Sequence, residues 1–204
     1  MKSERSYTMT ARADAVATTR ERIVAAAQAL LIEHAYEDIT LAAIAKAAGV
    51  SHQTVLNHFE SKEGVARAAA AELGRETTTA RDAAVPGDVE GVVRILVGEY
   101  ERFGDANARW AVTSERLGGL AEILDDARAN HQAWLARLFD DRLPRTGAAR
   151  RRAVSGLHAA TDVYTWKLLR RDLALPRAET ERTICMLVRG VLDQTDPKEP
   201  EESP

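Results

Sequence analysis

The sequence has a single cysteine, Cys185, only 5% aromatic residues, and no apolar run close to a membrane span, for which about 20 consecutive residues are needed. One cysteine cannot form a disulfide within the chain or a thiolate metal site. The polar N-terminus also lacks the apolar core of a signal peptide. We therefore expect a cytoplasmic protein with no membrane partner. Ala and Leu are abundant among the 45% of residues that are apolar, which favours helices over sheets.

An excess of positive charge is also missing. The formal net charge is −3, and residues 1–75 contain nine Lys and Arg against nine Asp and Glu. The remaining residues contain 19 basic and 22 acidic side chains. The N-terminal part is less acidic than the rest, but it is not a basic patch, so charge alone does not indicate a nucleic-acid partner.

Motifs of the common enzyme classes are absent as well. The sequence contains no GxGxxG or phosphate-loop pattern, no HExxH and no glycine-flanked nucleophilic serine, and its five histidines lack metal-ligand spacing. We therefore predict no catalytic residue, no cofactor and no metal, and we interpret the chain as a non-enzyme. Two alternatives stay open: a catalytic site assembled from several helices, and a helical adaptor protein.

Apolar periodicity predicts an all-α protein in four parts. Residues 1–18 are expected to be a flexible leader, and residues 19–74 a three-helix helix-turn-helix domain. Residues 75–194 are expected to form a larger helical domain, followed by a disordered tail at 195–204. The first helix is predicted from about Thr19 to His34, with Thr18 or Thr19 as its cap. Thr77 to Gly87 is expected to be a flexible joint between the two domains.

Residues 39–59 contain the most specific local pattern. Thr40 is placed to cap a helix from Leu41 to Ala48, which Gly49 ends because glycine readily adopts a positive φ. Ser51 is placed to cap a second helix from His52 to Phe59. Two short helices joined by such a turn are typical of a DNA-binding helix-turn-helix.

The second of these helices has an apolar and a polar face. Val55 and Phe59 are four residues apart and form the apolar side. The polar side chains lie away from it and are able to meet base edges; these are His52, Gln53, Thr54 and Asn57.

A longer motif surrounds this pattern and covers about Thr19 to Leu73. Its residues are Ile44-Ala45, Ala48-Gly49-Val50-Ser51, Thr54-Val55, His58-Phe59 and Ser61-Lys62-Glu63. They resemble the signature of the tetracycline-repressor (TetR) family. The resemblance implies a homodimeric transcriptional regulator, most often a repressor, that binds a palindromic double-stranded DNA operator and is released by a small-molecule effector.

The resemblance also indicates which residues meet DNA. We expect contacts from Thr40, Ser51, His52, Gln53, Thr54, Asn57, His58 and Lys62. Lys62 is expected to clamp a phosphate, whereas His58 is either a phosphate contact or a histidine at the edge of the core. The sequence departs from the family at Ala35, where glycine is usual, and at Leu56, where the hydroxyl of a tyrosine usually reaches a phosphate.

Five helices are predicted in the second domain. Their expected ranges are 89–103, capped by Asp88 and ended by Gly104-Asp105, then 107–117, 120–143, 148–173 and 177–194. The last two resemble the dimerisation pair of the family, although they could instead close a core within one chain. The expected interface residues are Tyr164, Leu168, Ile184, Leu187, Val188 and Val191.

Polar residues on faces that should be buried suggest where a ligand binds. His158, Thr161, Asp162 and Thr165 form a polar stripe at helical spacing, and His131 lies within an apolar stripe. Buried polar groups need partners, which could be one another, a dimer mate or a ligand. The ligand-pocket candidates are Tyr100, Phe103, Trp110, His131, Trp134, His158, Asp162, Thr165 and Trp166.

Overall fold

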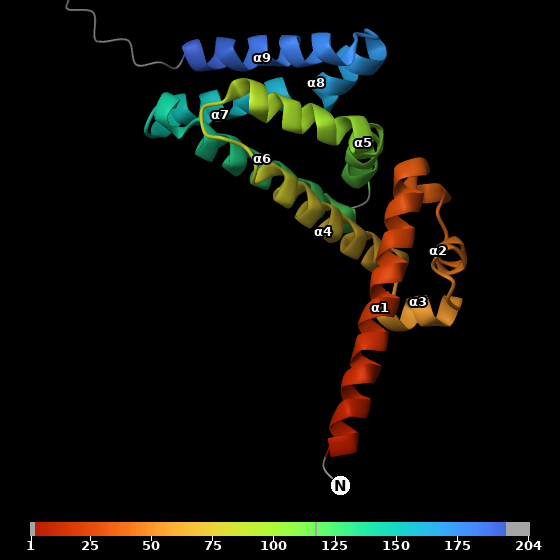
Figure 1. Cartoon of the computed structure of the whole chain (residues 1–204). Coiled ribbons are helices and arrows are strands. Elements are labelled where there is room, and N and C mark those ends of the chain that lie inside the picture. The colour runs from red at the N-terminus through yellow and green to blue at the C-terminus, as the bar shows by residue number, and fades with distance from the viewer. Residues whose placement is uncertain (1–2, 117, 195–204) are drawn as a thin grey trace, which may run out of the picture. The chain divides into compact units, whose positions relative to one another are not determined.

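The computed structural model describes residues 3–116 and 118–194, with side chains over 13–113 and 121–194. Every regular element in these ranges is helical, which confirms the predicted all-α class (Figure 1). None of the described helices is long and apolar enough to cross a membrane. The expected tail at 195–204 lies outside the described residues. The elements are α1 (Ser3–Glu33), η1 (Tyr36–Asp38), α2 (Leu41–Ala48), α3 (His52–Phe59), α4 (Lys62–Arg81), α5 (Val89–Arg116), α6 (Gly118–Leu138), η2 (Asp140–Arg142), α7 (Gly147–Thr161), α8 (Val163–Lys167), η3 (Leu168–Asp172) and α9 (Arg177–Asp193).

Backbone contacts divide the chain into two compact units. The first contains Met1–Glu76 and the segment Thr113–Ile123, and the second contains Thr77–Val112 and Leu124–Pro204. The segment Thr113–Ile123 is far from the other residues of the first unit in the sequence, and no local pattern indicated that it groups with them.

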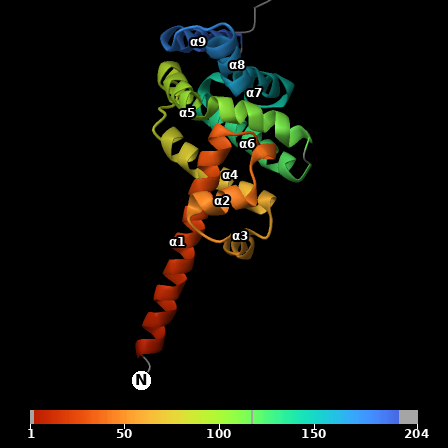
Figure 2. The ribbon, with the colours of Figure 1, turned by 90° about the vertical axis from the view of Figure 1, so that its right-hand side faces the viewer.

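The first unit has its own core beneath the two short helices. Helices α2 and α3 lie beside α1 in both views (Figures 1 and 2). Their apolar side chains meet those of α1 and α4 in one cluster, of which Ile23, Val55 and Val65 are fully buried. This packing fixes α3 by its apolar side and leaves its polar side exposed.

Helix α1 begins earlier than expected. It starts at Ser3, so the prediction of a helix start capped by Thr18 or Thr19 is wrong. The hydroxyls of Thr18 and Thr19 donate to the carbonyls of Asp14 and Ala15, at 2.9 and 2.8 Å, within a continuous helix. Residues 3–18 contain no Gly or Pro, so nothing in the local sequence ends the helix there. The expected leader at 1–18 is therefore helical from Ser3.

The turn after α1 explains how Ala35 replaces the usual glycine. Ala35 has φ −69° and ψ 147°, an ordinary extended conformation, and the chain then turns through η1. A residue with positive φ is not required at this position, so alanine fits without strain.

The second unit packs α5 to α9 around a separate apolar core. The fully buried side chains include Leu96, Leu135, Leu157, Trp166 and Leu192, and helix α9 lies along α7 (Figure 1). Cys185 is a free, buried thiol in this core.

The expected break at Gly104-Asp105 is wrong, because α5 continues through it to Arg116. Gly104 is needed for packing instead: a Cβ added there would lie 2.3 Å from Cζ3 of Trp166. The glycine lets the indole ring lie directly against the helix backbone. Of the helix expected at 107–117, Leu117 lies outside the described residues.

Three other expected boundaries also differ. Helix α4 extends to Arg81, so the first part of the expected joint is helical. Helix α6 runs from Gly118 to Leu138, ending before the expected Leu143. The helix expected at 148–173 is interrupted at Asp162, which has φ −70° and ψ 152° and accepts a hydrogen bond from the Tyr164 N–H as the N-cap of α8.

Candidate nucleic-acid interface

The helix-turn-helix has the local geometry that its sequence predicts. Thr40 accepts a hydrogen bond from the Ala43 N–H at 3.1 Å, and Ser51 accepts one from the Thr54 N–H at 3.0 Å. Gly49 has φ 65° and ends α2. These observations confirm both predicted caps and the predicted positive φ, and the bounds of α2 and α3 agree with the prediction.

Two arginines that the motif did not single out support the turn. The Arg22 guanidinium donates to the carbonyl of Ala48 at 2.6 Å, satisfying a carbonyl at the end of α2. The Arg20 guanidinium lies 4.9 Å from the centre of the Phe59 ring. Their only signal in the sequence is that they occur on the predicted first helix.

The exposed face of α3 carries His52, Gln53 and Asn57. The Gln53 Nε2 donates to the Asn57 Oδ1 at 2.9 Å, so the two amides form a pair. This bond leaves the Gln53 carbonyl oxygen as an acceptor and the Asn57 NH₂ as a donor. The pair therefore presents both hydrogen-bond functions on one helix face.

Of the other contacts predicted at α3, the N-cap Ser51 is exposed, whereas Thr54 and His58 are half-buried. The hydroxyls of Ser51 and Thr54 lie 2.8 Å apart and form a pair at the start of the helix. His58 is half-buried, with its ring centre 6.1 Å from that of Phe59. This position is compatible both with a phosphate contact and with a histidine at the edge of the core.

Lys62 is held against the protein rather than extending freely. Its Nζ lies 4.1 Å from the centre of the Tyr36 ring and donates to the Glu37 carbonyl at 3.4 Å. Burial lowers the pKa of Lys62, against the opposing effect of Glu37 and Asp38. An ammonium has three donors, so this anchored position leaves Lys62 able to donate to a phosphate. The part of Tyr36 in holding it was not apparent from the sequence.

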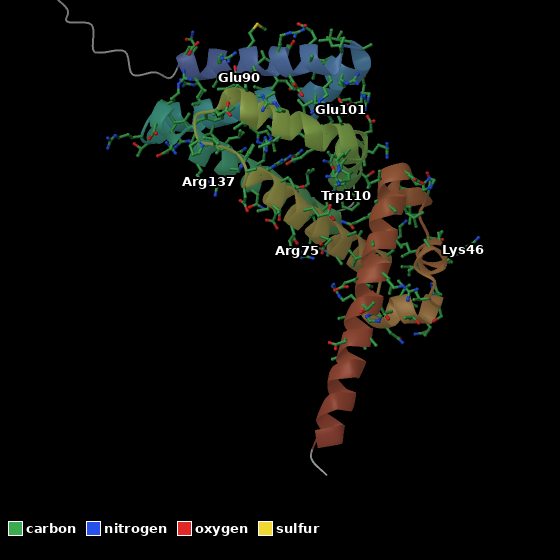
Figure 3. The ribbon with its side chains drawn as sticks, viewed as in Figure 1. Lys46, Arg75, Glu90, Glu101, Trp110 and Arg137 are labelled. Atoms are coloured by element: carbon green, nitrogen blue, oxygen red, sulfur yellow. The ribbon has the colours of Figure 1, made fainter. Side chains whose placement is uncertain are left out.

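Exposed positive charge is also present on α2. Lys46 is exposed and projects away from α1 (Figure 3). Helix α2 thus has a capped N-terminus at Thr40 and an ammonium in its last turn. A helix N-terminus and a cation both attract phosphate.

In the second unit, a group of polar side chains is buried among the apolar ones. The Tyr100 hydroxyl donates to the Thr161 carbonyl at 2.9 Å, and Nε2 of His131 lies 2.9 Å from the Thr161 hydroxyl. Nε2 of His158 lies 3.1 Å from the Asp162 carboxylate. Five of the predicted ligand residues, Tyr100, His131, Trp134, His158 and Asp162, are brought together here.

The four remaining ligand candidates make their polar contacts with other residues. The Trp166 indole donates to Glu101, which is labelled in Figure 3, at 3.3 Å. The Thr165 hydroxyl donates to the Ala159 carbonyl, and Phe103 lies under the Arg102 guanidinium. Trp110 is half-buried on α5. Of the four, Trp166 touches the group, with its ring centre 5.8 Å from that of Tyr100.

Sequence reasoning missed an ion pair beside this group. Arg81 and Glu99 bond through both carboxylate oxygens at 2.9–3.2 Å, and the guanidinium lies 4.9 Å from the centre of a Trp134 ring. Burial raises the pKa of Glu99, although the hydrogen bond and charge of Arg81 oppose this effect. In the described part of the chain, no group of three or more His, Cys, Asp or Glu side chains could hold a metal ion.

The predicted dimer residues divide into two sets. Ile184 and Val188 are buried in the chain's own core, so their assignment to an interface is wrong; they close that core instead. Val191 is half-buried against the same core. Tyr164, Leu168 and Leu187 are exposed. Leu173 and Met186, which the prediction omitted, are exposed as well. We call these five side chains, which lie on and between α8 and α9, the α8–α9 surface.

Comparison with known proteins gives a match in the first unit. Residues 23–69 match the family described as bacterial regulatory proteins, tetR family. A search of curated proteins gives no significant match. The matched segment contains all of α2 and α3.

Solved structures resemble the whole fold. A transcriptional regulator from Rhodococcus sp. Rha1 has a TM-score of 0.72 at 20% identity, covering 88% of this chain and 99% of its own. A tetR-family transcriptional regulator from Streptomyces coelicolor has a TM-score of 0.70 at 17% identity, covering 92% of each chain. SmeT in complex with triclosan has a TM-score of 0.59 at 21% identity, covering 92% of this chain and 99% of its own. At these identities, the likeness establishes the fold.

Proposed function

We propose that this chain, a tetR-family transcriptional regulator by its N-terminal domain, is a homodimeric repressor that binds a palindromic operator in the cytoplasm and is released by a small molecule. It acts by binding rather than by catalysis. In this proposal α3 enters the major groove of each half-site, and the two half-sites are about 34–36 Å or somewhat more apart. A dimer bound at a promoter would obstruct transcription without further contacts.

The exposed face of α3 is the observation that carries this proposal. The helix is capped at Ser51, packed through Val55 and Phe59, and exposes the bonded pair Gln53 and Asn57. Paired amides are suited to read base edges, since Gln and Asn bond to adenine in the major groove. Phosphate contacts would come from the N-terminus of α2 and from Lys62, so the domain can hold DNA although residues 1–75 have no net charge.

The α8–α9 surface supports the homodimer. Five large apolar side chains are exposed on α8, on η3 and the residue that follows it, and on α9, from 39% for Leu187 to 63% for Met186. Concentrated apolar exposure of this kind commonly marks a protein interface. A symmetric pairing of α8 and α9 with their counterparts would bury it.

The polar group around His131 supports a ligand in the second unit. SmeT, a protein of similar fold, is described in complex with triclosan. We propose that a small molecule bound in the second unit shifts the dimer toward a state with lower operator affinity.

Selection of bound duplexes from a random DNA pool tests the proposal. We expect enrichment of one palindrome, which the protein retains in a gel-shift assay against excess random DNA. Gln53→Ala and Asn57→Ala should relax the selected sequence. Two exposed residues of the same types on α6 provide matched controls, Gln132→Ala and Asn130→Ala, which should leave it unchanged. Failure to enrich any sequence would contradict DNA recognition.

A further inference from the structure

Three adjacent rings in the second unit have buried nitrogen atoms without a partner. Among the described residues, nothing bonds to Nδ1 of His131, Nε1 of Trp134 or Nδ1 of His158. The His131 ring centre lies 6.0 Å from that of Trp134 and 5.1 Å from that of His158. His131 and Trp134 are each only 7% exposed. An unpaired buried polar atom costs roughly 1–3 kcal/mol, so three together indicate a site that a ligand completes.

The bonds of Thr161 determine the proton position on His131. The Thr161 hydroxyl donates to the Leu157 carbonyl at 2.8 Å, so its oxygen can only accept from Nε2 of His131 at 2.9 Å. Burial, together with the nearby charges of Arg81 and His158, lowers the pKa of His131 to about 3, so the ring is neutral at pH 7. With its single proton on Nε2, His131 presents Nδ1 as an acceptor.

The other two nitrogens have defined functions as well. Burial raises the pKa of Asp162, but hydrogen bonds from His158 and from the Tyr164 N–H bring it below its usual value. The ionised carboxylate therefore accepts from Nε2–H of His158. The neutral form of His158 then offers Nδ1 as a second acceptor, whereas Nε1 of Trp134 is always a donor.

The charged groups around these rings already have hydrogen-bond partners. Arg81 is bonded to Glu99 through both carboxylate oxygens, and the Asp162 carboxylate accepts from His158 and from the Tyr164 N–H. An ionic ligand would bring a further charge into a buried site whose charged groups are already bonded, which is costly. An uncharged ligand avoids this cost.

We propose that His131, Trp134 and His158 bind an uncharged ligand through a hydroxyl group. The ligand O–H donates to Nδ1 of His131, and its oxygen accepts from Nε1–H of Trp134. His158 accepts from a second donor where the ligand has one. This inference deepens the proposed function, on which it rests for the regulatory consequence of ligand binding.

A series of small aromatic probes on the full chain tests the ligand class. Phenol has a donor and an acceptor, anisole only an acceptor, toluene neither, and benzoate carries a charge. The indole N–H resonance of Trp134, assigned as the one missing from Trp134→Phe, is followed by NMR titration. We expect phenol to shift it and to bind at least about tenfold more tightly than the other three, the effect of one hydrogen bond.

The variants add a second test. Trp134→Phe should weaken phenol binding about tenfold, while Trp110→Phe, on α5, should leave it unchanged. Should Trp134→Phe not fold, the three indole resonances are followed without assignment and the probe ranking alone decides. Equal binding of phenol, anisole and toluene, tighter binding of benzoate, or no shift with any probe would overturn the proposal.

Operator binding, measured on the same preparation, separates this inference from the proposed function. Operator retention without phenol binding overturns only the ligand assignment. Phenol binding in a protein that selects no DNA supports the ligand site and overturns the regulator. Release of the operator by phenol supports both.

Discussion

Gln53 and Asn57 form one hydrogen-bonded unit on the exposed face of α3. The Gln53 Nε2 donates to the Asn57 Oδ1 at 2.9 Å, one helical turn away. The bond restricts both side chains before any partner arrives, which lowers the conformational entropy lost on binding. It also makes their contributions to recognition interdependent.

The first prediction concerns this interdependence. Gln53→Ala and Asn57→Ala should each weaken operator binding by about 1–3 kcal/mol if the pair makes a bidentate base contact. The double variant should lose less than the sum of the two, because either substitution alone already disrupts the pair. Dissociation constants of all four proteins for the selected operator measure the coupling. Strict additivity would show that the two side chains act separately.

Lys62 should act on affinity rather than on sequence choice. Lys62→Ala is expected to weaken binding to all duplexes alike and to lower the slope of log K against log salt by about one. Lys167→Ala, which removes an ammonium paired with Asp172 in the second unit, provides the control and should leave the slope unchanged. A changed sequence preference in Lys62→Ala would instead indicate a base contact.

Gly104 should be intolerant of a side chain. Gly104→Ala places a methyl group against the Trp166 ring, where the nearest carbon is 2.3 Å from the ideal Cβ position. Such overpacking typically lowers the free energy of unfolding by about 1–3 kcal/mol. Gly98→Ala on the same helix meets nothing closer than 3.7 Å and should be neutral or stabilising. Urea denaturation of the two variants makes the comparison, and equal stabilities would contradict the packing role.

His131 should make the protein less stable in acid. Its pKa falls from 6.5 to about 3 in the folded chain, mainly through burial. The unfolded chain therefore binds a proton below pH 6.5 that the folded chain does not, so stability is lost between pH 6.5 and 3, by about 1.4 kcal/mol per unit. His131→Gln removes this proton uptake. Between pH 7.0 and 5.5, the free energy of unfolding should therefore decrease more in the unaltered protein than in His131→Gln.

The α8–α9 surface should determine the oligomeric state. Leu168→Asp with Leu187→Asp places two charges on it and is expected to give monomers in sedimentation experiments. Val85→Asp changes an exposed apolar residue elsewhere in the second unit and should leave a dimer. A double variant that sediments with the dimer would place the interface elsewhere.

The accuracy of sequence reasoning differed between the two units. The caps at Thr40 and Ser51, the positive φ of Gly49 and the burial of Val55 and Phe59 were predicted correctly, because each depends on residues within four positions. Gly104 shows the opposite case. Its local pattern indicated a helix end, yet its role is set by Trp166, a residue 62 positions away that no nearby residue reveals.

By itself, the sequence determined that the protein is helical and that it contains a helix-turn-helix with polar side chains on its exposed face. Only the tertiary structure decided which apolar residues are buried and which are exposed, as Ile184 and Leu187 show, and that the His131 ring contacts those of Trp134 and His158. The physical reason is the distance along the sequence over which each interaction acts. Capping and helix periodicity act within a turn or two of the chain, whereas burial and the pairing of polar groups depend on helices that meet only after folding.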